Sequence, residues 1–173
     1  MSTDKKKHLI QDSPVEVVDS RGRALAVVPA SEAHRQSLPH RAAMVLFFDA
    51  EGKLLLEKRP PEARVFPGRW DVTARDHIRP GEAALDAAKR LAEALYPGFA
   101  GQMTCLRSIG PTAGTGFESV QVFRCRVSGI PHGRDVLAVS REELEALAQD
   151  FRELFAPAVI HALEARSIYP ESE

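Results

Sequence analysis

The chain of 173 residues has little of what several classes of protein require. Its two cysteines, Cys105 and Cys125, stand in strand-like runs far from any CxxC spacing, so we expect reduced thiols in a cytoplasmic protein. Aromatic residues make up 6% of the chain, too few for an extended surface on which bases stack. The formal net charge of -1 gives no electrostatic reason to expect a nucleic acid polymer as partner. No apolar run approaches the ~18 residues of a membrane span, so no membrane partner is expected.

The remaining composition is that of an ordinary globular domain. Hydrophobic residues make up 44% of the chain and charged residues 27%. Residues 1–13 are charged and no apolar block follows them, so they do not resemble a secretory signal and are expected to form a flexible tail. Residues 14–169 contain no linker and no internal repeat, and this length is enough for one domain with its own core.

The pattern of apolar and turn residues predicts a strand-rich chain with one central helix and further helices at the end. Ser140 and Glu143 form a capping box, which marks a helix start, and Pro157 suits the first turn of another helix. This order favours an α+β fold over an alternating doubly wound fold. The expected elements are a hairpin of strands 15–18 and 24–28, helical turns at 31–36, strands at 40–49, 53–58 and 70–74, a helix at 82–95, strands at 103–109 and 118–127, and helices that begin at 140 and near 157, the last ending near 166.

The expected helix 82–95 has two contrasting faces. At 100° per residue all its charged side chains gather on one face, and the opposite face is apolar, with Ala84, Ala88, Leu91 and Leu95. Pro97-Gly98 then ends the helix. The charged face consists of Glu82, Asp86, Lys89, Arg90 and Glu93.

The Gly81-Glu82 turn and the small pair Ala87-Ala88 resemble the motif of the Nudix hydrolases, G-x5-E-x7-R-E-U-x-E-E-x-G-U with U aliphatic. The resemblance covers roughly residues 15–165. It implies an α+β Nudix-type α/β/α sandwich with a mixed sheet, an N-terminal β-hairpin and C-terminal helices. The motif is degenerate, because Asp76 stands in place of its first glycine.

Two alignments of the motif differ in the helix. A strict count places Arg90 at the family's arginine and apolar residues at its glutamates. A one-residue deletion places Lys89 at the arginine and Glu93 at one glutamate, and the helical periodicity favours this second alignment. In either case a position that usually holds a metal-binding or basic glutamate is changed.

The resemblance implies metal-dependent hydrolysis of a nucleoside diphosphate derivative or another organic diphosphate, with Mg²⁺ or Mn²⁺ as cofactor. Such ions neutralise the polyanion and orient water, and they need converging oxygen ligands. Glu82, Glu93 and Glu118 are the candidate catalytic residues. Glu82, Glu93, Asp86 and His77 are the candidate metal ligands, and we expect any metal binding to depend on Glu82.

Several segments further resemble the Nudix branch related to isopentenyl-diphosphate isomerase: HRA before the strand at 40, LLL-x-x-R after it, and PG-x-W-D in the next loop. In that enzyme three histidines and a glutamate bind metal, and His34, His40, His77 and Glu118 stand near the matching places. Imidazole ligands would favour Mn²⁺, Zn²⁺ or Fe²⁺ over Mg²⁺. The isomerase also needs a cysteine two residues before the loop histidine, where this chain has Arg75. An arginine stays protonated and cannot exchange protons with a carbon skeleton.

Four residues are candidates for substrate binding: Arg59, Trp70, Lys89 and Arg90. Guanidinium groups suit phosphate, and an indole ring can stack on a base or an apolar tail. Two alternatives to an active hydrolase stay open. One is a non-catalytic Nudix-fold protein that binds a ligand, and the other is a scaffold, with a possible homodimer through the hairpin edge.

Overall fold

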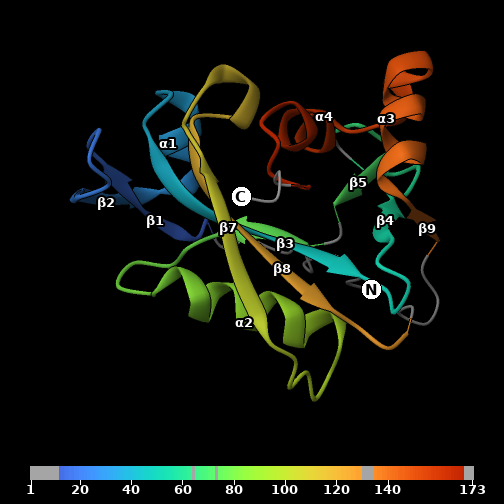
Figure 1. The fold of residues 1–173 in the computed structure, drawn as a ribbon. Coiled ribbons are helices and arrows are strands. Elements are labelled where there is room, and N and C mark those ends of the chain that lie inside the picture. The colour runs from blue at the N-terminus through green and yellow to red at the C-terminus, as the bar shows by residue number, and fades with distance from the viewer. Residues whose placement is uncertain (1–11, 64, 73, 130–134, 170–173) are drawn as a thin grey trace, which may run out of the picture.

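The computed structural model describes residues 12–63, 65–72, 74–129 and 135–169. It confirms the predicted order of the main helices and strands, divides one predicted strand into two, and adds β9 and the short 3-10 helices η1 and η2, which sequence patterns did not predict (Figure 1). The elements are β1 (Pro14–Val18), β2 (Ala24–Pro29), α1 (Ala30–Arg35), β3 (His40–Phe48), β4 (Leu54–Lys58), β5 (Trp70–Val72), β6 (Ala74–His77), α2 (Ala84–Leu95), β7 (Met103–Ile109), η1 (Ala113–Thr115), β8 (Glu118–Arg126), β9 (Val136–Val139), α3 (Arg141–Asp150), η2 (Arg152–Leu154) and α4 (Pro157–Glu164).

Strand β3 is the centre of a mixed sheet. It pairs in parallel with β8 along its whole length and antiparallel with β6, β1 and β4. The predicted strand 70–74 is in fact two strands with different partners, since β5 pairs with β4 while β6 pairs with β3. The missed strand β9 pairs with β4. Central pairing explains the unbroken apolar run from Ala42 to Phe48, because these residues are buried on both faces of the sheet.

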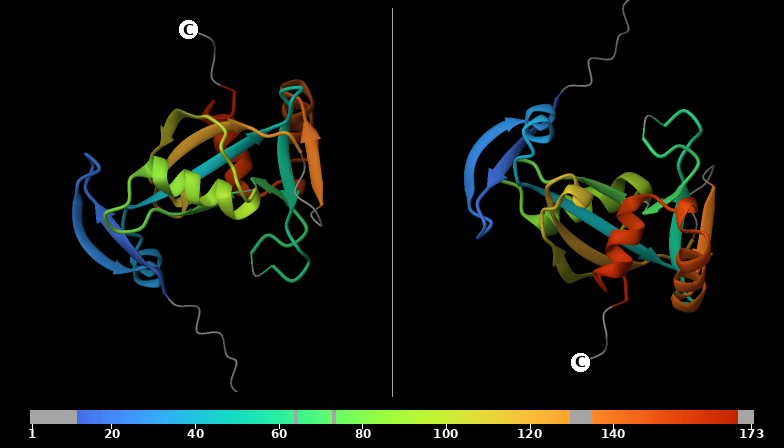
Figure 2. Two further views of the ribbon diagram at one scale, coloured as in Figure 1. Left: turned by 90° about the horizontal axis from the view of Figure 1, so that it is seen from below. Right: turned by 90° about the horizontal axis from the view of Figure 1, so that it is seen from above.

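The two faces of the sheet carry different helices (Figure 2). Along β3, Met44, Leu46 and Phe48 pack into the core that includes Val159 and Ile160 of α4. The alternate residues of β3 pack with Ala88 and Ala92 of α2. This arrangement confirms the α/β/α sandwich, because a strand sends successive side chains to opposite faces.

Helix ends follow the predicted chemistry. The side chain of Ser140 accepts a hydrogen bond from the amide of Glu143, and the carboxylate of Glu143 accepts one from the amide of Ser140. Pro157 is at the start of α4. The predicted tail 1–13 lies outside the described residues up to residue 11, while the next residue, Asp12, accepts a 2.9 Å hydrogen bond from the amide of Ser31 in α1. In the described part of the chain, no helix is long and apolar enough to span a membrane.

Candidate metal centre

Four potential metal ligands meet at one edge of the sheet. His40 begins β3 and Glu118 begins β8, and the parallel register places these two residues directly opposite each other. Strand β6 runs the other way, so its last residue, His77, arrives at the same edge opposite Ala42. His34, in the last turn of α1, completes the cluster.

The ligand atoms of this cluster, which we call the histidine cluster, all lie within 4.8 Å of one another. His34 Nε2 is 3.1 Å from His77 Nε2, and His77 Nε2 is 3.3 Å from Glu118 Oε1. The same carboxylate oxygen is 3.9 Å from His40 Nε2 and 4.0 Å from His34 Nε2. Metal–ligand bonds of about 2.1 Å place neighbouring donors roughly 3.0–3.4 Å apart and opposite donors roughly 4.2 Å apart. The spacing therefore suits one shared ion.

His40 shows the most specific feature of the cluster. Its side chain is fully buried, and its Nδ1 lies 2.8 Å from the carbonyl oxygen of Leu38, so Nδ1 carries the proton and Nε2 a lone pair. Among the described residues, Nε2 has no hydrogen-bond partner. Burial lowers the pKa of His40, although the Leu38 carbonyl and Glu118 oppose this, and the ring is therefore neutral near pH 7. A buried lone pair that faces other donors is what a metal ligand needs.

Glu118 divides its two oxygens between different partners. Oε1 faces the histidines, while Oε2 accepts hydrogen bonds from Nε and Nη2 of Arg75. Burial acts to raise the pKa of Glu118, but its hydrogen bond with His77 and the charge of Arg75 outweigh this and lower the pKa overall. Glu118 is thus an ionised carboxylate, suited to hold a cation and poorly suited to accept a proton.

The donor set fits a divalent cation such as Mn²⁺, Zn²⁺ or Fe²⁺. Three imidazole nitrogens are borderline ligands, and Mg²⁺ prefers oxygen. The guanidinium of Arg75 lies beside this position and donates hydrogen bonds to the outer oxygen of Glu118 and to the carbonyl of Thr115, so it does not replace the ion.

The charged residues of the Nudix motif form a separate network with its own cation. Arg90 donates to both oxygens of Glu82, at 2.9 and 3.0 Å, and its Nη1 lies 3.2 Å from Asp76. These contacts lower the pKa of Glu82, chiefly through the hydrogen bonds from Arg90. The pairing agrees with the strict alignment, in which Arg90 takes the place of the family's arginine. A guanidinium therefore occupies the position beside Glu82 where sequence patterns placed a metal ion.

The other predicted ligands of α2 do not join the histidine cluster. Glu93 accepts hydrogen bonds from the amides of Gly98 and Phe99, at 2.9 and 3.0 Å, and so holds the turn after the helix. Asp86 is exposed in the first turn of α2. Lys89 and Arg90 line a separate small cleft with Glu93, and neither is among the residues that line the cavity at the cluster.

A cavity of about 760 Å³ opens over the histidine cluster. Arg59 lines it as predicted, and its guanidinium is held by Asp71 at 2.8 Å and by the carbonyl of Val65 at 2.9 Å. Trp70 is half-buried and packs on the core instead, with Lys58 Nζ 5.7 Å from its ring centre.

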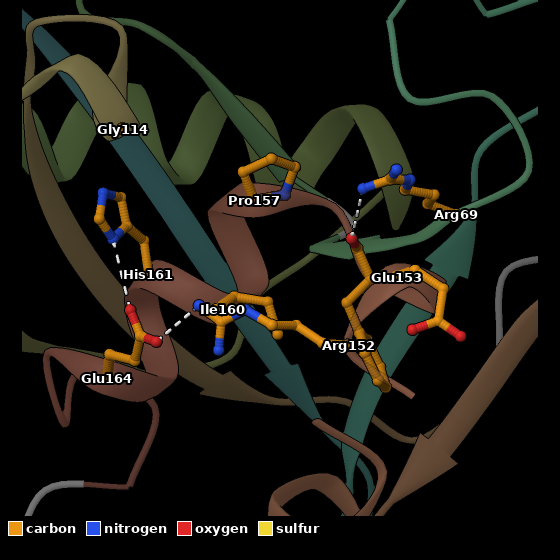
Figure 3. Close-up of a pocket in the computed structure, with 9 residues that line it drawn as sticks. Arg69, Gly114, Arg152, Glu153, Pro157, Ile160, His161 and Glu164 are labelled. Atoms are coloured by element: carbon orange, nitrogen blue, oxygen red, sulfur yellow. Dashed lines mark hydrogen bonds and ion pairs between the residues drawn. The ribbon is translucent and has the colours of Figure 1, made fainter. Parts of the chain in front are cut away.

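A second cavity of about 500 Å³ shares Gly114 and Pro157 with the first as lining residues (Figure 3). Three of its side chains form ion pairs: Arg152 lies 2.6 Å from Glu164, and His161 Nδ1 lies 3.9 Å from the same carboxylate. His161 also packs directly on the backbone of Gly114, so that a side chain at 114 would overlap its ring.

Comparison with known proteins shows the family of this chain. The model of the NUDIX domain matches residues 38–168, and the chain belongs to the Nudix family. An isopentenyl-diphosphate Delta-isomerase of Nocardia farcinica is 40% identical over 123 residues, which cover 70% of this chain and 61% of that protein. An uncharacterized Nudix hydrolase of Yersinia pestis is 33% identical over 79 residues, which cover 46% of this chain and 43% of that protein. Each match thus spans less than two thirds of the relative.

The fold is also shared with a solved structure. The crystal structure of DR0079 from Deinococcus radiodurans superposes with a TM-score of 0.73 at 20% identity, and it covers 90% of this chain and 99% of that one. This likeness supports the fold alone.

Two features of the site were not predicted from the sequence. One is the ion pair between Arg75 and Glu118, and the other is the contact of Arg75 with the Thr115 carbonyl. The alternation along β6 does place Arg75 and His77 on one face, and Asp76 on the other. The sequence contains that alternation, but it does not show that β8 pairs in parallel with β3 and so brings Glu118 beside these residues.

Proposed function

We propose that this protein is a metal-dependent hydrolase of an organic diphosphate, such as a nucleoside diphosphate derivative, and that His34, His40, His77 and Glu118 hold the ion. The observation that carries the proposal is the lone pair of His40, buried and without a partner among the described residues, beside an ionised carboxylate. A divalent ion neutralises charge on a diphosphate and acidifies water near it. The donor set favours Mn²⁺ over Mg²⁺.

The charges around the cavity support an ion-dependent anion site. Arg59 is paired with Asp71, and Arg75 with Glu118, so these charges cancel. Asp76 shares Arg90 with Glu82, so these two carboxylates and one guanidinium keep a net negative charge. Without an ion the cavity therefore offers little net attraction to a diphosphate, whereas a divalent ion makes it positive. A positive cavity would then attract the phosphates of the substrate.

Hydrolysis suits these residues better than isomerisation, although relatives are named as isomerases. Moving a double bond requires a side chain that exchanges a proton with carbon, and Arg75 cannot do this. The cysteines do not replace it, because neither lines the cavity, and burial raises the pKa of Cys125 to about 12.

One observation favours the alternative of a non-catalytic binding protein. Arg90 neutralises Glu82, and Glu93 is bonded to backbone amides, so the Nudix motif supplies no second cation site among these groups. A protein that keeps only the histidine cluster could bind an ion and an anionic ligand without turnover.

The test begins with protein stripped by a chelator and titrated calorimetrically with Mn²⁺. Phosphate release is then measured on a panel of nucleoside diphosphate derivatives and isoprenoid diphosphates, together with isomerisation of the latter. We expect turnover in wild type, at least a 100-fold loss in Glu118→Gln, roughly the effect of removing a transition-state interaction, and no change in Glu145→Gln on the exposed face of α3.

The outcomes separate the candidates. Mn²⁺ binding without release on any substrate supports the binding protein, and isomerisation without release contradicts the hydrolase. No Mn²⁺ binding refutes both metal-dependent functions. Loss of Mn²⁺ binding in Glu82→Gln, but not in Glu118→Gln, would assign the ion to the Nudix helix.

A further inference from the structure

Arg75 is joined to the histidine cluster by its ion pair with Glu118. Residues 75 and 77 share one face of β6, so this guanidinium lies beside His77 on the cavity side of the sheet. Its Nε donates to Glu118 Oε2 at 3.0 Å, and its Nη2 donates to the same oxygen and to the carbonyl of Thr115 at 3.0 Å.

Three of the five N–H groups of Arg75 are thereby used. The two on Nη1 have no hydrogen-bond partner in the described part of the chain, and the side chain is 23% exposed where it lines the cavity. The guanidinium is thus fixed on one side by a carboxylate and a carbonyl, and it offers its other side to a ligand. Arg59, the other guanidinium of the cavity, is held by Asp71 and by its own loop.

We propose that Arg75 binds a phosphoryl oxygen of the substrate through Nη1, next to the ion, while Glu118 holds the same guanidinium in place. This proposal rests on the proposed function. Glu118 then has two tasks, because one oxygen faces the ion and the other orients the arginine. A fixed planar cation suits phosphate, and no rearrangement is needed when the ligand enters.

A role in phosphate binding differs from a role in positioning Glu118. If Arg75 binds phosphate, its loss lowers the affinity for the diphosphate ligand and leaves the affinity for Mn²⁺ unchanged. If Arg75 only positions Glu118, its loss lowers the affinity for Mn²⁺ itself. The two affinities are measured separately, by Mn²⁺ titration of stripped protein and by titration of Mn²⁺-loaded protein with methylenediphosphonate, a diphosphate analogue that is not hydrolysed.

The variants are Arg75→Gln and Arg75→Lys, with Arg126→Gln as the matched control. Arg126 is exposed at the far end of β8, so its loss removes the same charge away from the cavity. We expect Arg75→Gln to bind methylenediphosphonate about 10- to 100-fold more weakly, as for a lost charge-assisted hydrogen bond, with Mn²⁺ affinity within about threefold of wild type. Arg75→Lys, which keeps the charge, should fall between, and Arg126→Gln should match wild type.

Unchanged methylenediphosphonate affinity in Arg75→Gln would overturn the proposal, and so would a loss of Mn²⁺ affinity that accounts for the whole effect. If Arg75→Gln does not fold, Arg75→Lys decides, because wild-type affinity in that variant contradicts a requirement for the planar donor. Failure of the wild type to bind Mn²⁺ would refute the proposed function itself, which is a different result.

Discussion

The replacement His40→Asn tests the metal centre most directly. An asparagine amide can still donate to the Leu38 carbonyl, as Nδ1 does, but it lacks an atom in the place of Nε2. The variant therefore removes one of the four potential metal ligands and keeps the hydrogen bond to Leu38. We expect the metal-dependent part of the stability to fall sharply.

The magnitude follows from linkage. A ligand at 100 times its Kd stabilises the folded state by about 2.7 kcal/mol. For a domain of this length, that is a rise in Tm of roughly 5–10 °C. If the loss of His40 weakens Mn²⁺ binding about 100-fold, the same Mn²⁺ concentration adds only about 0.4 kcal/mol, or roughly 1 °C.

The assay is calorimetric unfolding of wild type, His40→Asn and Glu145→Gln, each with chelator and with Mn²⁺ at 100 times the wild-type Kd. Comparing each variant with itself cancels any cost of the substitution to the metal-free fold. An equal rise in Tm for wild type and His40→Asn would refute the reasoning, and so would a rise that disappears in Glu82→Gln and persists in His40→Asn.

Three further predictions concern other parts of the structure. Without metal, the free energy of unfolding should fall as the pH drops below about 6.5, because burial lowers the pKa of folded His40 and the unfolded chain then binds more protons. Denaturant melts at a series of pH values should show a weaker dependence of this free energy on pH in His40→Asn, and an equal dependence would contradict the prediction. Glu93→Ala should lower the free energy of unfolding by about 1 kcal/mol, because two amides lose their acceptor, and calorimetry should show unchanged Mn²⁺ affinity. Gly114→Ala should lower the free energy of unfolding by about 1 kcal/mol, because the new methyl group overlaps the partly exposed His161 ring and displaces it from its rotamer, and the cost should be smaller in a His161→Ala background; an equal cost in both backgrounds, measured by thermal melts, would contradict this.

Local patterns predicted most of the secondary structure. The capping box at Ser140, the proline at 157 and the two-faced helix after Gly81 act within one or two turns, so their signals are contained in a few neighbouring residues. Strand β9 was missed because it is short and follows residues outside any clear pattern. The division of 70–74 into β5 and β6 depends on which strands they pair with, and that is not a local property.

Sequence alone also showed that the Nudix motif is degenerate, because this depends only on which residues stand at its positions. Helical periodicity nevertheless favoured an alignment that places Glu93 at a ligand position, and the structure pairs Arg90 with Glu82 and gives Glu93 to backbone amides. Periodicity assigns a side chain to a face of a helix, but it does not say which partner that face meets.

The residues of the centre were thus visible in the sequence, while their convergence was decided by tertiary structure. The parallel register of β3 and β8 places His40 opposite Glu118, and the antiparallel β6 brings His77 to the same edge. A shift of one residue in either register would turn these side chains to the other face, towards α2. Register is set by the packing of both faces of the sheet together, which no single segment of the chain contains.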